Sequence, residues 1–232
     1  MYAQFESMWT QIANRFKDYS ERLIFEPFNE IRVHNNWSGG STHFAVVNEL
    51  LSRFVKTVRA TGGNNTARLL MCPTYAAIVT KDAVEALVLP NDDFLMVSVH
   101  DYIPQAFTFK PADWTPSETV FNVAQNTIYY EEIFGRLSNL FTSKGIPVIL
   151  GEFGAAYKAA YVSNDSERLK WAETVCSVAR KHGVICIYWD DGWEDTFDGT
   201  GSNTSMGLLN RRTLTWKFPE LRDKVINTSL GK

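Results

Sequence analysis

The chain has 232 residues, of which 45% are hydrophobic and 21% are charged, and this composition is ordinary for a soluble globular protein. Its formal net charge of −3 gives no basic field that could hold nucleic acid. No run of 18 apolar residues occurs, so we expect neither a transmembrane helix nor a membrane partner. The first residues do not combine a basic segment with an apolar one, so we expect no signal peptide in this chain.

Helical and strand patterns alternate along the chain. Apolar residues at helical spacing, as at Phe5, Trp9, Ile12 and Phe16, indicate helices, and short runs that are apolar throughout indicate strands. In chain order the sequence predicts a helix at 3–18, a strand at 22–28, a helix at 41–61, a strand at 69–75, a helix at 80–88, a strand at 94–100, a loop at 101–120, a helix at 121–144, a strand at 147–153, a loop at 155–166, a helix at 167–182, a strand at 184–190, a loop at 191–205 and a helix at 217–228.

Short apolar strands that are separated by helices predict an α/β fold in which parallel strands are covered on both faces. The pattern alone leaves a doubly wound sheet and a barrel both open. The three cysteines, Cys72, Cys176 and Cys186, lack the close spacing of metal ligands, and no glycine-rich phosphate loop is present. We therefore expect neither a metal nor a cofactor.

Polar and aromatic residues gather where the predicted strands end. In α/β folds ligands bind at the carboxyl ends of the strands, so these residues predict an active site. Each has an ordinary reading when taken alone, because a glutamate after a strand is often a surface charge and a tryptophan is often core. Together they are hard to explain as packing. The candidates are Asn29, Glu30, His100, Tyr102, Glu152 and Trp189.

Two glutamates at strand ends suit the hydrolysis of a glycosidic bond. That reaction needs one protonated carboxyl group to donate to the leaving oxygen and one ionised carboxylate. In the retaining mechanism the two groups lie about 5 Å apart. We therefore predict this separation for the carboxyl groups of Glu30 and Glu152.

At these residues the chain resembles glycoside hydrolase family 5, and within it the bacterial and anaerobic-fungal endo-β-1,4-glucanases. The resemblance implies that Glu30 is the acid/base and Glu152 is the nucleophile. It also implies that Asn29 bonds the sugar 2-hydroxyl, that His100 and Tyr102 orient the glutamates, and that Trp189 stacks beneath the sugar. The segments that carry it are RLIFEPFNEIR (22–32), RATGGNN (59–65), VSVHDY (97–102), GIPVILGEFG (145–154), YWDDG (188–192) and LLNRRTLTW (208–216).

The sequence departs from the family pattern beside the acid/base. Ile31 stands where the family usually has a proline, and Pro27-Phe28 replaces the usual small residue and methionine. Near the fifth predicted strand, the usual pair of tryptophans is reduced to Trp189. The departures at Ile31 and Pro27-Phe28 change the local backbone more than the chemistry.

The resemblance further implies that only part of the family fold is present. The family has a (β/α)8 TIM barrel, and the strands predicted here resemble strands four to eight with their helices. We therefore expect residues 1–232 to be a single catalytic domain fragment, truncated at its N-terminus, that lacks the first three βα units. The strands at 22–28 and 184–190 would then have open edges, which favours self-association.

The sequence thus predicts a hydrolase, namely a retaining, endo-acting β-glucan hydrolase of the cellulase type or the C-terminal fragment of one. The expected partner is a β-glucan polysaccharide, and the resemblance implies an extracellular location. Two alternatives stay open. The first is a hydrolase of mannan or xyloglucan on the same scaffold, and the second is a glucan-binding remnant without activity.

Overall fold

The computed structural model describes four segments of the chain, residues 1–109, 119–158, 164–192 and 205–232. The chain forms two compact units. Unit 1 comprises residues 1–99 and 143–148, and unit 2 comprises residues 100–142 and 149–232. Parts of the three predicted loops at 101–120, 155–166 and 191–205, namely residues 110–118, 159–163 and 193–204, lie outside the described residues.

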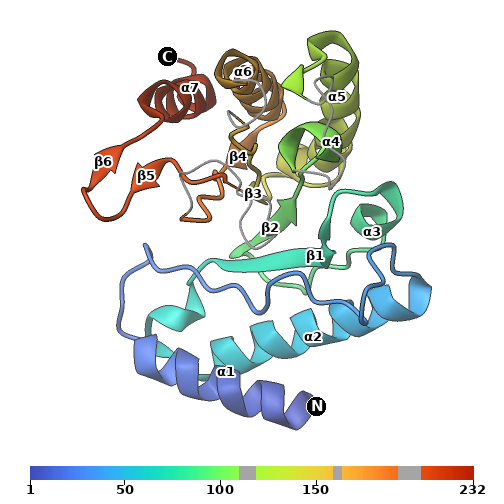
Figure 1. Ribbon diagram of the computed structural model, residues 1–232. Coiled ribbons are helices and arrows are strands. Elements are labelled where there is room, and N and C mark those ends of the chain that lie inside the picture. The colour runs from blue at the N-terminus through green and yellow to red at the C-terminus, as the bar shows by residue number, and fades with distance from the viewer. Residues whose placement is uncertain (110–118, 159–163, 193–204) are drawn as a thin grey trace. The chain divides into compact units, whose positions relative to one another are not determined.

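Unit 1 packs two long helices against its strands. The helices α1 and α2 contact each other, and α2 contacts β1 (Figure 1). Residues four apart on α2, such as Val47, Leu51 and Val55, are buried, which is the burial expected for one face of an amphipathic helix. The elements of unit 1 are α1 (Tyr2–Phe16), α2 (Ser41–Ala60), η1 (Gly63–Thr66), β1 (Leu70–Ile78), α3 (Lys81–Glu85) and β2 (Leu95–His100).

Aromatic side chains from both helices fill the core of unit 1. The Trp9 and Phe54 rings meet edge to face with centroids 4.6 Å apart, and Phe25 packs against Trp9 from the loop after α1. β1 and β2 are hydrogen-bonded neighbours, and every residue of β2 is buried. These are the buried, mostly apolar strands that the sequence predicts.

The predicted strand at 22–28 is wrong except at one residue. Phe25 alone pairs with β1, through an isolated parallel bridge to Leu70. The carbonyl group of Leu23, two residues earlier, accepts a hydrogen bond from the buried Arg68 guanidinium at 2.5 Å instead of bonding a neighbouring strand. Pro27 has no N–H to donate to a strand ladder. The segment is therefore anchored by the buried Arg68 side chain and by backbone hydrogen bonds at Phe25, and does not form a regular strand.

Unit 2 packs a row of helices over two neighbouring strands. Helix α6 lies between α5 and α7 and contacts both, and it also contacts β4 (Figure 1). β3 and β4 are hydrogen-bonded neighbours. After α5 comes the short turn η3 (Thr142–Lys144). The other elements are α4 (Gln105–Thr108), α5 (Val123–Leu140), β3 (Val148–Glu152), α6 (Asp165–Lys181), β4 (Val184–Cys186), β5 (Leu209–Asn210), β6 (Thr215–Trp216) and α7 (Pro219–Leu230).

The last predicted strand is shorter than expected. β4 ends at Cys186, although the sequence predicts a strand to residue 190. The chain beyond Cys186 still follows β3, because the N–H of Ile187 bonds the Leu150 carbonyl and the N–H of Trp189 bonds the Phe153 carbonyl. The apolar run therefore continues beside β3 as irregular backbone, and this places Trp189 just past the end of β3.

A small hairpin near the C-terminus was not predicted. Leu209 pairs with Trp216 and Asn210 pairs with Thr215 in antiparallel register. Strands of two residues are too short to show the alternation by which a strand is recognised. No helix in the described residues is long and apolar enough to cross a membrane.

Candidate active site

Glu30 lies in unit 1, in the loop that follows Phe25. Its backbone has φ of 42°, a left-handed conformation that is uncommon for a residue with a side chain and is often found at functional sites. The carbonyl group of Glu30 accepts a hydrogen bond from Arg32 at 3.0 Å, and the same Arg32 nitrogen lies 3.7 Å from a carboxylate oxygen. The side chain of Glu30 is 21% exposed, which leaves the carboxylate accessible to a ligand.

The segment after Glu30 is fixed on β1. The hydroxyl group of Tyr75 accepts a hydrogen bond from the N–H of Val33 at 3.2 Å and donates one to the Asn36 carbonyl at 2.7 Å. The N–H of Ala76 bonds the carbonyl group of Ile31, the residue where the family usually has a proline. A buried tyrosine on β1 therefore holds the loop that follows Glu30.

An aromatic platform lies beside Glu30. The guanidinium group of Arg32 stacks over the Trp37 ring at 3.7 Å from its centroid, and Trp37 is 46% exposed. Asn29 is also exposed. The sequence reasoning missed Arg32 and Trp37, because neither follows a predicted strand directly.

Glu152 lies in unit 2 as the last residue of β3. One carboxylate oxygen, Oε2, accepts a hydrogen bond from the Tyr102 hydroxyl at 3.0 Å and lies 3.5 Å from Nδ1 of His100. His100 is buried and Glu152 is half-buried. Two side chains from the end of β2 therefore converge on one oxygen of Glu152, as the resemblance implied for residues that orient a glutamate.

Trp189 borders the same cluster. Its ring meets the Tyr102 ring edge to face with centroids 6.0 Å apart, and it is only half-buried. The structure thus gathers four of the predicted residues, His100, Tyr102, Glu152 and Trp189, within unit 2. Asn29 and Glu30 are together in unit 1. The pairing of Glu30 with Glu152 spans the two units and stays a prediction.

The backbone after Glu152 is fixed by polar side chains. A Cβ at Gly154 would lie 2.6 Å from Sδ of Met206, so only glycine fits without a shift of that side chain. The buried Arg168 donates from Nε to the Ala155 carbonyl at 3.1 Å, and Asn164 donates to the Ala156 carbonyl at 2.9 Å. The close approach of Met206 explains the glycine that closes the Gly-Glu-Phe-Gly motif.

Asp190, the acidic residue next to Trp189, has a structural role. Its carboxylate accepts hydrogen bonds from the N–H groups of Gly192 at 2.8 Å and Leu208 at 3.0 Å, and Arg211 donates to it at 3.0 Å. The carboxylate thereby joins the end of the Trp189 segment to the residues before the β5–β6 hairpin.

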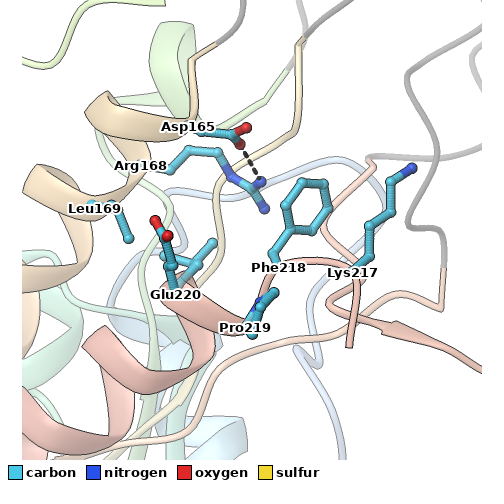
Figure 2. A pocket seen from close by; sticks show the side chains of 8 residues that line it. Asp165, Arg168, Leu169, Lys217, Phe218, Pro219 and Glu220 are labelled. Atoms are coloured by element: carbon cyan, nitrogen blue, oxygen red, sulfur yellow. Dashed lines mark hydrogen bonds and ion pairs between the residues drawn. The ribbon is translucent and has the colours of Figure 1, made fainter. Parts of the chain in front are cut away.

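A separate cavity of about 270 Å³ opens on unit 2 where α6 and α7 begin. Figure 2 shows the ion pair of Asp165 with Arg168 and the Phe218 ring beside the guanidinium group, whose carbon is 4.4 Å from the ring centroid. None of the six predicted site residues lines this cavity. It is lined by Asp165, Arg168, Leu169, Lys217, Phe218, Pro219, Glu220 and Leu221.

Strands that alternate with helices, and a glutamate held by tyrosine and histidine at a strand end, define an α/β protein of the glycosidase class. The chain belongs to glycosyl hydrolase family 5, because the family model described as cellulase (glycosyl hydrolase family 5) matches residues 1–194. Its α/β architecture is therefore part of a (β/α)8 TIM barrel, and the predicted family and fold are confirmed.

Relatives of known sequence carry endoglucanase names. The chain is 40% identical over 225 residues to Endoglucanase 1 of Ruminococcus albus, covering 94% of this chain and 51% of that protein. It is 40% identical over 229 residues to Endoglucanase B of Neocallimastix patriciarum, covering 95% of this chain and 45% of that protein. The chain thus spans about half the length of these two relatives.

The solved structures that superpose on the chain also include proteins described as endoglucanases. A GH5-4 broad specificity endoglucanase from Clostridium cellulovorans superposes with a TM-score of 0.89 at 37% identity, covering 98% of this chain and 64% of that one. A GH5-4 broad specificity endoglucanase from Ruminococcus champanellensis, solved with bound cellotriose, gives a TM-score of 0.85 at 39% identity, with coverages of 97% and 63%.

Proposed function

We propose that the protein is a retaining, endo-acting β-glucan hydrolase in which Glu152 is the nucleophile and Glu30 is the acid/base. The observation that carries the proposal is the convergence of Tyr102 and His100 on one oxygen of Glu152. The ionised form of a glutamate is the form that attacks the sugar carbon. With Oε2 bonded by the Tyr102 hydroxyl and close to His100, the other oxygen, Oε1, is the atom that would bond the sugar.

The proposed reaction has two steps. In the first, Oε1 of Glu152 attacks the anomeric carbon while Glu30 gives a proton to the departing glycosidic oxygen, and a glycosyl ester forms. In the second, Glu30 takes a proton from water, the water oxygen attacks the same carbon, and Glu152 leaves as a carboxylate. The glucan is thus cut with retention of the anomeric configuration, and both glutamates return to their starting states.

The names of the relatives support a β-glucan as the substrate. The Ruminococcus albus and Neocallimastix relatives are named endoglucanases, and one superposed structure holds cellotriose. In this chain, Trp189 is proposed to pack against the apolar face of a sugar ring, and its half-buried ring beside Tyr102 supports this proposal. Asn29 is proposed to bond the sugar 2-hydroxyl next to Glu30.

Xyloglucan is the second candidate substrate. A GH5 xyloglucan-specific endo-β-1,4-glucanase in complex with cellotriose superposes with a TM-score of 0.84 at 29% identity, covering 99% of this chain. A main chain of β-1,4-linked glucose is common to cellulose and xyloglucan, so the same two glutamates would serve both reactions.

Hydrolysis of soluble polysaccharides by the purified chain tests the proposal. We expect release of reducing ends from carboxymethyl cellulose or lichenan, together with an early fall in viscosity that marks internal cleavage. Proton NMR should show the β-anomer first. A Glu152→Gln variant is the control for contaminating activity. Binding to glucan without hydrolysis would instead support an inactive remnant, and activity on xyloglucan or mannan alone would replace the proposed substrate.

We also propose an extracellular site of action, because an intact polysaccharide is too large to reach an enzyme inside a cell. Antibody detection in separated culture medium and cells of the source organism would test this. Retention of the protein with the cells would contradict it.

A further inference from the structure

Asp101 is a buried acidic residue that lies between the two residues in contact with Glu152. It follows β2 directly and separates His100 from Tyr102 in the sequence. Its Oδ1 accepts hydrogen bonds from the N–H of Ile103 at 3.2 Å and from the hydroxyl group of Tyr129 at 3.1 Å. Its Oδ2 is buried and has no hydrogen-bond partner among the described residues.

The charge state of Asp101 follows from this setting. A buried carboxylate is costly unless a cation or several donors compensate it, and here one oxygen has no donor. Burial therefore raises the pKa of Asp101 to about 7, against the smaller opposing effect of hydrogen bonds from the Ile103 backbone, the Tyr129 hydroxyl and the Tyr102 backbone. The titratable groups around it are Tyr129 and Tyr130 on α5, with Glu132 and Arg136 further along that helix, Glu152 on β3, and the flanking His100 and Tyr102.

Asp101 is connected to the Glu152 cluster through short backbone contacts. Its own N–H bonds the Glu152 carbonyl at 3.1 Å. Ile103 is held at both polar groups, because its N–H bonds Asp101 and its carbonyl accepts the hydroxyl group of Tyr130 at 2.5 Å. Tyr102 lies between these two fixed residues, so α5 restrains the backbone from which the Tyr102 hydroxyl reaches Glu152.

We propose that Asp101 is a positioning residue whose neutral carboxyl group, held by Tyr129, keeps the Tyr102 hydroxyl on the Glu152 carboxylate. The neutral form suits this place because a second negative charge behind Glu152 would repel the nucleophile and disturb the donors around it. The catalytic meaning rests on the proposed function, whereas the positioning itself does not. Ionisation of Asp101 above neutral pH weakens the arrangement.

The first experiment needs no turnover. Carbon-13 NMR of the chain labelled at aspartate carboxyl groups should show one resonance, absent from Asp101→Asn, that titrates near pH 7. Crystal structures of two variants should then separate the roles. Asp101→Asn keeps the acceptor oxygen and should keep the distance from the Tyr102 hydroxyl to Glu152 near 3.0 Å. Asp101→Ala should lengthen it beyond hydrogen-bonding reach.

Kinetics on a soluble β-glucan then tests the consequence. Asp101→Ala and Tyr129→Phe should lower kcat, by roughly tenfold for the alanine variant, with little change in KM, since the lost hydrogen bond acts on the nucleophile. Asp101→Asn should retain kcat at acid pH and move the alkaline limb of the pH profile upward. Glu167→Gln is the matched control, because Glu167 is another carboxylate that accepts a backbone N–H, that of Phe121, and it should leave the profile unchanged.

The outcomes distinguish the two proposals. An inactive wild-type chain with the expected NMR and crystallographic results would overturn the proposed function and support the positioning. An Asp101 resonance that titrates near pH 4 would overturn the positioning proposal, and so would an unchanged distance in Asp101→Ala. If the alanine variant does not fold, Tyr129→Phe and Asp101→Asn decide, and loss of the Tyr102 contact in Asp101→Asn would count against the proposal.

Discussion

The Tyr102 hydroxyl and His100 reach Glu152 from the same strand end, and both are directed at a single carboxylate oxygen. This one-sided arrangement fixes the rotamer of the glutamate and leaves its other oxygen for chemistry. Glu30 is held differently, by a strained backbone and by Arg32, with no regular strand beneath it. Because the two glutamates are held differently, we expect their removal to have unequal effects on turnover.

Removal of the two glutamates should give different substrate profiles. Glu152→Ala is expected to abolish turnover of every substrate, because no covalent intermediate can form. Glu30→Ala should spare aryl glycosides with very good leaving groups, since these need little acid assistance. Comparison of kcat/KM on a dinitrophenyl cellobioside and on lichenan measures this. Equal losses on both substrates would contradict the assigned roles.

Tyr102→Phe tests the donor on Glu152. The hydroxyl group donates to Oε2 at 3.0 Å, and a hydrogen bond to a charged group contributes about 1.5–3 kcal/mol, so kcat should fall by roughly 10- to 150-fold. Trp189 remains as a packing partner of the ring, which limits the loss of stability. Steady-state kinetics beside thermal unfolding separates the two effects, and a variant with unchanged kcat would show that the donor is dispensable.

Asp101 also predicts how stability depends on pH. Its pKa of about 7 lies above the ordinary value of 3.8, so between these values the folded chain binds a proton that the unfolded chain has lost. The free energy of unfolding therefore falls as pH rises from about 4 to 7 and then levels off. Asp101→Asn removes this loss and should gain at least about 1 kcal/mol over wild type at pH 7 relative to pH 4. Urea unfolding at several pH values measures the difference, and a constant difference would contradict the raised pKa.

At the scale of elements, single polar side chains connect segments that are not paired as regular strands. The guanidinium group of Arg68 is fully buried and bonds the carbonyl groups of Phe16, Tyr19, Ser20 and Leu23. It joins the end of α1 to the start of β1. In unit 2, Asp190 joins the Trp189 segment to the residues before the hairpin in a similar way.

Arg68→Met should therefore be strongly destabilising. The substitution removes these four hydrogen bonds made by a buried charged group, and each hydrogen bond to a charged group contributes about 1.5–3 kcal/mol, so we expect a loss of about 3 kcal/mol or more. Urea denaturation with fluorescence detection measures it. Arg53→Met is the matched control, because Arg53 pairs with Glu6 and Glu49 on the surface and its replacement should change the midpoint little. Similar midpoint shifts in the two variants would refute the role given to Arg68.

At the scale of the whole molecule, β4 is an edge strand with exposed apolar side chains. β4 pairs with β3 on one side and with no described strand on the other, and Ile185 and Ile187 are 52% and 48% exposed. The second predicted edge, at residues 22–28, is not a strand. The expectation of self-association therefore now rests on β4.

Introducing charge at this edge should reduce association. Ile185→Lys combined with Ile187→Lys is expected to shift the chain toward monomer, because lysine on an edge strand opposes pairing with another chain. Ile226→Lys, a change of similar exposure on α7, is the control and should have no effect. Light scattering during size-exclusion chromatography measures the mass. A wild-type chain that elutes as a monodisperse monomer of 26.4 kDa would contradict the prediction.

The sequence by itself determined the helices, the buried strands and the family, because these depend on local periodicity and on short motifs such as Asn29-Glu30 and the segment around Glu152. It also placed His100 and Tyr102 correctly beside Glu152, since the carboxyl ends of neighbouring parallel strands meet at one edge. The tertiary structure decided the features that depend on contacts between residues far apart in the sequence. Arg68 anchors the segment at 22–28 that the sequence predicts as a strand, the contacts of Ile187 and Trp189 continue β4 as irregular backbone, and burial between strand end and helix raises the pKa of Asp101. None of these can be read from neighbours in the chain, because each depends on a residue at least 28 positions away.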